Sequence, residues 1–212
     1  CDAVQAAGRI PVDFGALQVD YMSLSAHKIG GPQGVGALVF APGCEPQKFM
    51  CGGGQEKRLR AGTENVAGIA GFGKAAELAV ADMQDFQSLE ALRLQLEKDL
   101  LAAAPELKIY GADAPRVSNT IAMGCQGMTA ETQLMNLDLA GVAVSSGSAC
   151  SSGSFKPSPV LKAMGATEEQ ARSALRVSLG WHTTADDIAV FRDKWIEVYH
   201  RVRQVEASSA AS

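Results

Sequence analysis

The sequence lacks the features typical of membrane, secreted, zinc-binding or nucleic-acid-binding proteins. No apolar run reaches the ~20 residues of a transmembrane helix, and no secretory signal pattern is present. The five cysteines form no CxxC pair, and the three histidines show no HxxxH spacing, which disfavours a disulfide framework and a metal site. The net charge of −4 implies no basic face for nucleic acid. The sequence therefore predicts a cytoplasmic protein, because thiols stay reduced there, with no membrane or nucleic-acid partner.

An initiator methionine is also absent, because the chain begins with Cys1. Its 212 residues are 47% hydrophobic and 20% charged, which suits a globular protein of one domain or one and a half. The composition changes near residues 82–88, which predicts a boundary between residues 1–85 and 86–212. We expect the chain to be a piece of a longer protein.

The chain is organised around Lys28, in a turn between two predicted strands. Residues 19–24 have the pattern of a buried strand and residues 35–40 that of a second strand, and the turn between them holds three glycines and a proline. Desolvation at such a strand end favours the neutral amine of a lysine, which can attack a carbonyl. A solvated loop lysine is the alternative, but Ser25 and His27 stand beside Lys28 and can bind an anion.

A second constellation is the segment SSGSACSSGS at residues 145–154, in which Cys150 is the one thiol. A structural cysteine prefers an apolar buried site, so Cys150 does not fit a core position. A thiol on a mobile polar loop suits attack on one substrate and delivery to another. The other internal cysteines, Cys44, Cys51 and Cys125, lack this setting and are interpreted as structural or incidental.

Arg176 is a charged residue in an apolar strand predicted at residues 175–179. An unpaired buried charge is very costly, so Arg176 needs a partner. A carboxylate that accepts two hydrogen bonds is the natural one. That carboxylate belongs either to an internal salt bridge or to a substrate.

Helical spacing is clearest after Thr63, a predicted helix N-cap. The helical region covers roughly residues 64–103, and Arg93 and Glu97 are expected on its outer face. The alternation of further α and β elements predicts a two-layer sandwich. These elements are strands at 107–110, 119–123, 142–144 and 175–179, and helices at 129–140 and 185–205.

Together these stretches resemble the cysteine desulfurases of the iron–sulfur-cluster and nitrogen-fixation type, within the class V aminotransferase family. The resemblance extends over nearly the whole chain, in the family's order. It implies the α/β type I pyridoxal-phosphate transferase fold and a homodimer. Residues 1–85 would be the C-terminal part of the large cofactor domain, and residues 86–212 the small C-terminal domain. The matching segments are DAVQ (2–5), SAHK (25–28), GGGQE (52–56), RAGT (60–63), SSGSAC (145–150) and RVSLG (176–180).

The resemblance also implies a role for each matching residue. Lys28 would form the Schiff base with pyridoxal 5'-phosphate, and Arg176 would hold the carboxylate of L-cysteine. Cys150 would take the substrate sulfur as a persulfide, leaving L-alanine, and pass it to a sulfur-acceptor or iron–sulfur scaffold protein. The remaining cofactor contacts would be Asp2 at the pyridinium nitrogen, Gln5 at the ring hydroxyl, Ser25 and His27 at the phosphate, and Thr63 at the phosphate of the neighbouring subunit's cofactor.

The chain departs from the family pattern in two places. The family's first half is absent, so we expect this chain alone to be inactive. Trp181-His182 follows Gly180 where the family often has Arg-Phe. Two other functions stay open: a class V aminotransferase or lyase for which Cys150 is incidental, and an inactive fragment that serves as a dimerisation or partner-binding module.

Overall fold

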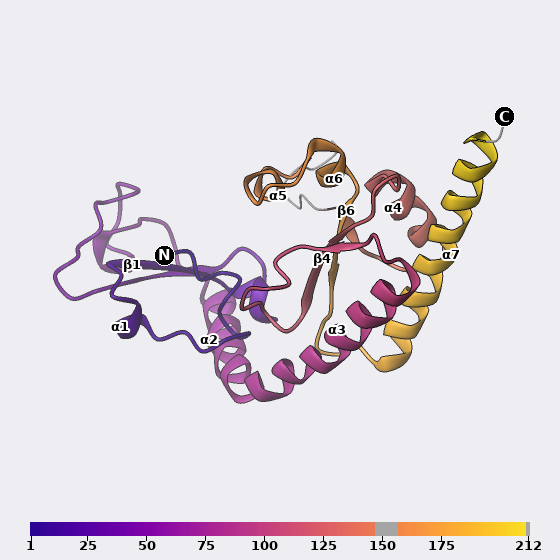
Figure 1. Ribbon diagram of the computed structural model, residues 1–212. Coiled ribbons are helices and arrows are strands. Elements are labelled where there is room, and N and C mark those ends of the chain that lie inside the picture. Colours follow the sequence, from indigo (N-terminus) through magenta and orange to yellow (C-terminus); the bar gives the residue numbers. More distant parts are fainter. Residues whose placement is uncertain (147–156, 211–212) are drawn as a thin grey trace. The chain divides into compact units, whose positions relative to one another are not determined.

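The computed structural model describes residues 1–146 and 157–210, so Cys150 lies outside the described residues. The chain divides into two compact units, Cys1–Gln87 and Ser88–Ser212 (Figure 1). Both units combine helices with antiparallel strands. In the described part of the chain, no helix is long and apolar enough to cross a membrane.

The first unit is built on an antiparallel hairpin of strands β1 (Tyr21–Ser25) and β2 (Gly36–Phe40). The short 3-10 helix η1 (Ala26–Ile29) lies in the connection between them. Glycine is required at Gly36, because a Cβ atom there would lie 2.7 Å from the carbonyl oxygen of Leu24. The hairpin therefore closes tightly and presents η1 at its tip. The unit also contains α1 (Phe14–Leu17) and η2 (Glu56–Arg58).

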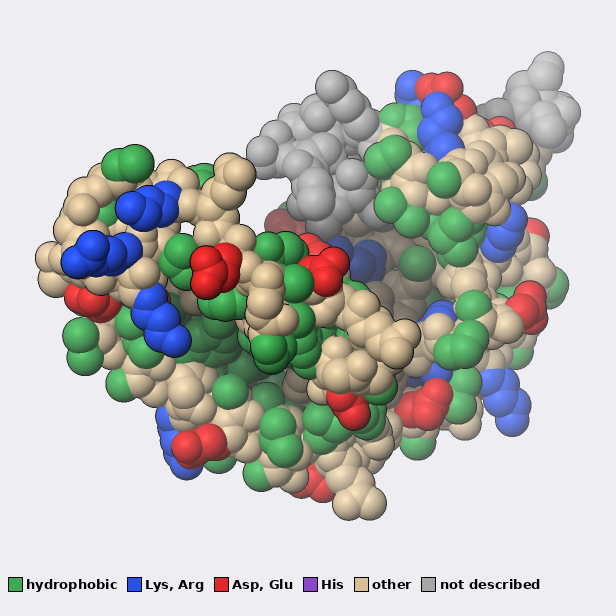
Figure 2. Space-filling view, turned by 90° about the vertical axis from the view of Figure 1, so that its left-hand side faces the viewer, with side chains coloured by type: hydrophobic (Ala, Val, Ile, Leu, Met, Phe, Trp, Pro, Cys, Tyr) green, Lys and Arg blue, Asp and Glu red, His purple; other side chains and the backbone are tan. Residues whose placement is uncertain are grey.

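The hairpin is less buried than its apolar sequence predicts. Only Met22 of β1 is buried, and β2 is exposed along its whole length. A two-stranded sheet buries little side-chain area by itself. The strand predicted at residues 19–24 is confirmed as β1, but its predicted burial is wrong except at Met22. Figure 2 looks onto this side of the first unit and shows hydrophobic side chains open to solvent among charged ones.

Helices α2 (Val66–Ala81) and α3 (Met83–Ala103) follow each other along the chain. The N-cap of α2 is Asn65, whose side-chain oxygen accepts a hydrogen bond from the Gly68 N–H at 3.1 Å. The predicted cap at Thr63 is wrong, because the N-cap must directly precede the first helical residue.

The second unit contains a four-stranded antiparallel sheet with the order β3-β4-β6-β5. The predicted strand at residues 142–144 is wrong, because the first residue of β5 to pair with β6 is Ser145. The N–H of Val142 instead bonds the carbonyl of Leu137 at 2.9 Å, which ties this segment to the end of a helix. The elements are β3 (Lys108–Ile109), β4 (Thr120–Gly124), α4 (Ala130–Leu139), β5 (Ser145–Ser146), α5 (Pro159–Ala163), α6 (Glu168–Arg172), β6 (Ala174–Ser178) and α7 (Ala185–Ala210).

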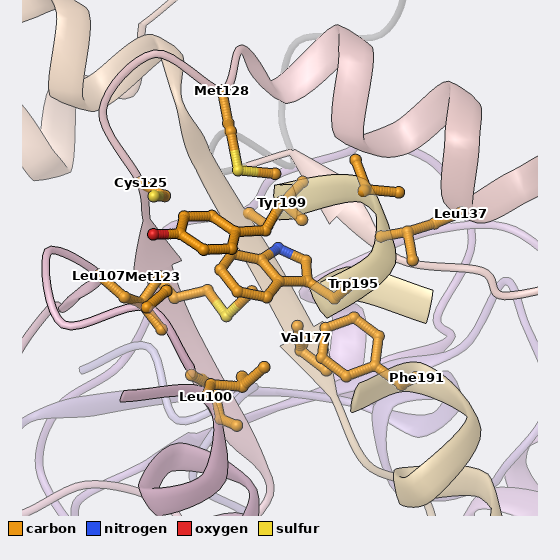
Figure 3. Packing of buried hydrophobic residues seen from close by; sticks show 14 of the residues in the cluster. Leu100, Leu107, Met123, Cys125, Met128, Leu137, Val177, Phe191, Trp195 and Tyr199 are labelled. Carbon is orange, nitrogen blue, oxygen red and sulfur yellow. The ribbon is translucent and has the colours of Figure 1, made fainter. Parts of the chain in front are cut away.

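The main core of this unit lies between one face of the sheet and helices α3, α4 and α7. Figure 3 shows the Trp195 indole within this cluster, and its ring stacks on Tyr199 with centroids 5.7 Å apart. Leu175 and Val177 of β6 belong to the same cluster. A smaller cluster beside α5 and α6 includes Ala174 of β6. Because successive side chains of a strand alternate between faces, the core positions of β6 assign Arg176 to the face opposite the main core.

Helix α3 carries a buried ion-pair cluster rather than an outward polar face. Arg93 is 3% exposed and Glu97 is 7% exposed, so the prediction that they point outward is wrong. A Glu97 carboxylate oxygen lies 2.9 Å from guanidinium nitrogens of both Arg93 and Arg116, and Glu90 lies 2.9 Å from Arg93. Arg116 reaches α3 from a distant loop, which helical spacing alone does not reveal.

Candidate functional site

The Lys28 region lies at the tip of the hairpin. His27 and Lys28 belong to η1, and both side chains are exposed. The hydroxyl of Ser25 lies 2.8 Å from Nδ1 of His27, so hydroxyl and imidazole form a pair at the start of η1. The prediction that the turn holds Lys28 partly out of water is wrong for this chain, because nothing in the hairpin tip covers its side chain among the described residues.

The N-terminal residues extend the hairpin sheet beside β1. Asp2 forms a parallel bridge with Ser23, and the N–H of Ser23 bonds the carbonyl of Cys1 at 3.0 Å. Ser23 is two residues before Ser25 on the same strand. The fold therefore brings Asp2 to the same small sheet as Ser25, His27 and Lys28, although Asp2 is far from them in the sequence.

Gln5 is held by a residue that the sequence analysis missed. Arg9 donates to the backbone carbonyl of Gln5 at 2.7 Å and to its side-chain Oε1 at 2.6 Å. Burial lowers the pKa of Arg9. With Oε1 engaged in this way, the Nε2 group of Gln5 is left to donate. The four-residue spacing of the pair was the available sequence signal.

Thr63 lies in an irregular segment of the first unit. It follows Gly62, whose φ of +107° is a conformation that other residues rarely adopt. Arg60 donates weakly to the carbonyls of Ala61 and Gly62, at 3.4 and 3.5 Å. The Thr63 side chain is exposed and makes no hydrogen bond within residues 1–146 and 157–210. Its hydroxyl is therefore open to a group outside this chain.

The triglycine turn lines a pocket of about 400 Å³ in the first unit, together with Lys48 and Arg58. After the turn, Glu56, Lys57 and Arg58 all have positive φ angles, between 48° and 69°. Three successive non-glycine residues in this region are strained. The turn therefore brings backbone and basic side chains around one concavity.

Arg176 belongs to the second unit and is half-buried. Its NH2 group donates to the Ser145 hydroxyl at 3.5 Å, across the β5–β6 pair. Its Nε is buried and has no hydrogen-bond partner among the described residues. The described part of the chain supplies no salt bridge to Arg176, so no carboxylate of these residues neutralises its guanidinium. Sequence reasoning missed Ser145 as a neighbour of Arg176, because only the strand register brings them together.

The cysteines differ in their settings. Cys150 lies outside the described residues, four positions after the end of β5 at Ser146. Cys44 donates to a carboxylate oxygen of Asp20 at 3.4 Å, and this hydrogen bond raises the pKa of the thiol. Cys125 is buried, whereas Cys1 and Cys51 are exposed, and none of these four described cysteines forms a disulfide.

Comparison with known proteins identifies a family. The model of the family described as aminotransferase class-V matches residues 1–191. The chain is 40% identical over 203 residues to a cysteine desulfurase of Enterobacter agglomerans, covering 96% of this chain and 51% of that protein. It is 44% identical over 190 residues to the cysteine desulfurase IscS of Clostridium botulinum, covering 88% of this chain and 48% of that protein. The chain thus spans about half the length of these curated relatives.

Solved structures agree with this assignment. A NifS-like protein from Rickettsia africae superposes with a TM-score of 0.85 at 38% identity, over 94% of this chain and 52% of that one. SspA, solved in complex with cysteine, superposes with a TM-score of 0.65 at 30% identity, over 86% of this chain and 50% of that one. The likeness to NifS-like structures confirms the predicted α/β type I fold.

Proposed function

Because the chain belongs to the aminotransferase class-V family, we propose that it acts in a pyridoxal-phosphate-dependent cysteine desulfurase. The reaction takes sulfur from L-cysteine, releases L-alanine and leaves a persulfide on Cys150. The structural observation that carries the proposal is Arg176, whose buried Nε lacks a partner among the described residues. It pairs with the strand that leads directly to the Cys150 segment. The candidate carboxylate anchor therefore lies opposite a strand that ends four positions before Cys150 in the sequence.

The donors of the first unit fit pyridoxal phosphate chemically. Lys28 offers an amine for the cofactor aldehyde, and Asp2 offers a carboxylate for the pyridinium nitrogen. The paired Ser25 and His27 offer two groups for the phosphate. The Nε2 of Gln5 can donate to the ring hydroxyl. When bound, the cofactor supplies an electron sink that weakens bonds at the substrate α-carbon.

The chain's own residues would divide the remaining work. Asp2 would keep a proton on the ring nitrogen, and Arg176 would orient the substrate by its carboxylate. The Cys150 thiolate would attack the substrate sulfur, so that a sulfur–sulfur bond forms while the carbon–sulfur bond breaks. The electron pair of the broken bond returns to carbon, which takes up a proton to become alanine.

The domain and partner assignments are part of the same proposal. Residues 1–85 would belong to the large cofactor domain, and residues 86–212 to the small domain that carries Cys150. In a homodimer, the free hydroxyl of Thr63 would reach the phosphate of the other subunit's cofactor. The persulfide would pass to a sulfur-acceptor or iron–sulfur scaffold protein in the cytoplasm. The name IscS of one relative supports this reading.

Substitution of Cys150 tests the proposal. In the full-length protein, Cys150→Ser should still bind the cofactor and cysteine, because Lys28 and Arg176 are untouched. It should form no protein persulfide and almost no alanine from labelled cysteine. Cys51→Ser, which removes an exposed thiol elsewhere in the chain, is the matched control and should keep normal activity. Near-normal alanine formation by Cys150→Ser would favour the aminotransferase or lyase alternative.

A further inference from the structure

A groove in the second unit has no role in the proposed chemistry. It lies between helix α4 and residues 142–144, has a volume of about 370 Å³ and is called the α4 groove below. Five of its lining residues are apolar and two carry carboxylates. The lining residues are Leu134, Met135, Val142, Ala143 and Val144, with Glu131 and Asp138.

The orientation of α4 is fixed by its buried side. The Gln133 amide donates to the carbonyls of Met128 and Ser173, both at 2.8 Å, and its Oε1 accepts a hydrogen bond from Trp195 at 2.9 Å. Leu137, one turn further on, is fully buried. These contacts hold the opposite side of α4 toward solvent, so its apolar residues there are exposed because of the fold and not through loose packing.

The exposed side of α4 combines apolar and acidic groups at helical spacing. Glu131, Met135 and Asp138 stand at positions i, i+4 and i+7, on one stripe of the helix. The Met135 side chain is 66% exposed. Within the described residues neither carboxylate forms an ion pair. The groove therefore combines an apolar surface with two carboxylates, Glu131 and Asp138, that have no cationic partner among the described residues.

The other wall of the groove is the segment at residues 142–144, which directly precedes β5. β5 is the outermost strand of its sheet, and its pairing begins at Ser145. Residues 143–144 precede this first pair and lie outside the sheet. An extended peptide can dock along such an edge, where apolar side chains on alternate positions enter the pocket.

We propose that the α4 groove docks an extended segment of a partner protein, in which apolar side chains are flanked by Lys or Arg. The apolar side chains would cover Leu134, Met135 and Val142, and the cations would pair with Glu131 and Asp138. Complementary charges of this kind mainly set specificity and association rate. The groove ends six residues before Cys150, so, if the proposed function holds, the docked partner is the sulfur acceptor.

The test uses two fluorescent probe peptides, Lys-Leu-Val-Leu-Lys and Glu-Leu-Val-Leu-Glu. The anisotropy of each peptide is measured while this 212-residue chain is titrated in. The basic peptide should bind, more weakly at higher salt, and the acidic peptide should not. The double variant Glu131→Lys/Asp138→Lys should have an affinity for the basic peptide that is lower by about tenfold or more. It should also bind the acidic peptide. Glu45→Lys with Asp113→Lys makes the same change in net charge outside the groove and should leave both affinities unchanged.

Several outcomes would overturn the proposal. The first is equal binding of the two peptides, and the second is binding of neither. A third is self-association of the chain that Met135→Ser abolishes, which would make the groove an interface between copies. Circular dichroism of each variant controls for folding. The measurement reports peptide binding and not desulfurase activity. A result against the proposed function would therefore leave the binding result unchanged, and the two proposals can be contradicted independently.

Discussion

Arg176 shows how a single residue can combine a structural cost with a binding role. Its Nε is buried without a partner among the described residues, and only the Ser145 hydroxyl reaches its guanidinium, at 3.5 Å. An unsatisfied buried donor of a charged group is destabilising. An incoming carboxylate would remove this cost, so the residue favours an anionic ligand.

We therefore predict that Arg176→Ala raises the apparent Michaelis constant for cysteine in the full-length protein, while cofactor binding persists. The lost interaction corresponds to about 2–5 kcal/mol. Arg176→Lys should recover only part of it, because lysine lacks the planar two-donor fork. Arg172→Ala, at an exposed arginine paired with Glu168, is the control. Unchanged cysteine saturation in Arg176→Ala would assign a structural role to Arg176.

Glu97 is a buried carboxylate through which pH affects the stability of the second unit. Burial alone would raise the pKa of Glu97, but the hydrogen bonds from Arg116 and Arg93 outweigh it and hold that pKa below its usual value. A carboxylate whose pKa is lower in the folded state stabilises it above the unfolded pKa. That stabilisation is lost as pH falls through the folded pKa.

Glu97→Gln should therefore lower the free energy of unfolding by about 3 kcal/mol at neutral pH, since it leaves the buried Arg93 with only the more exposed Glu90 as a charged partner among the described residues. Below about pH 5 the difference from the unmodified chain should shrink. Urea unfolding at several pH values measures both effects. Glu90→Gln, which removes the more exposed carboxylate paired with Arg93, should cost less than about 1 kcal/mol. A difference that stays constant with pH would contradict this account.

On the scale of the elements, the segment just before α2 holds two residues with different roles. Asn65 caps the helix, and Thr63, two positions earlier, is a candidate cofactor-binding residue. Asn65 caps the helix through its hydrogen bond to the Gly68 N–H. Thr63 makes no such bond and has an exposed side chain. The two residues should therefore respond differently to truncation.

We predict that Asn65→Ala lowers the free energy of unfolding by about 1 kcal/mol. Thr63→Ala should change it by less than about 0.5 kcal/mol, as at other exposed positions. In the proposed homodimer of the full-length protein, Thr63→Ala should instead release cofactor more readily, which a dialysis measurement detects. The reverse pattern, with stability lost in Thr63→Ala, would restore Thr63 as the cap.

On the scale of the whole molecule, the first unit leaves its candidate cofactor-binding side chains exposed to water. β2 is exposed along its length, and the side chains of His27 and Lys28 are exposed at the hairpin tip. The chain also spans about half the length of its curated relatives. A site that must exclude water from its reacting groups needs further polypeptide over this face.

We therefore predict that this chain alone, supplied with pyridoxal phosphate and cysteine, forms no measurable alanine. Borohydride reduction followed by peptide mapping should mark Lys28 in the full-length protein. In the isolated chain it should give much weaker labelling. Alanine formation by the isolated chain at a rate close to that of the full-length protein would contradict this prediction.

Local sequence determined much of the fold and the identity of the candidate residues. The turn after Lys28 and the helices at residues 129–140 and 185–205 were all predicted, because each depends on residues only a few positions apart. The family and its fold class followed from short motifs in order along the chain. None of these needed a distant part of the chain.

Tertiary structure alone decided which side chains are buried and which are paired. Arg93 and Glu97 have helical spacing typical of a solvent face, but both are buried in the fold. Arg116 from a distant loop forms an ion pair with Glu97. The β5–β6 register placed Ser145 against Arg176, and the segment at residues 142–144 joined α4 instead of the sheet. Burial and pairing depend on contacts between residues far apart in sequence, and no local pattern encodes them.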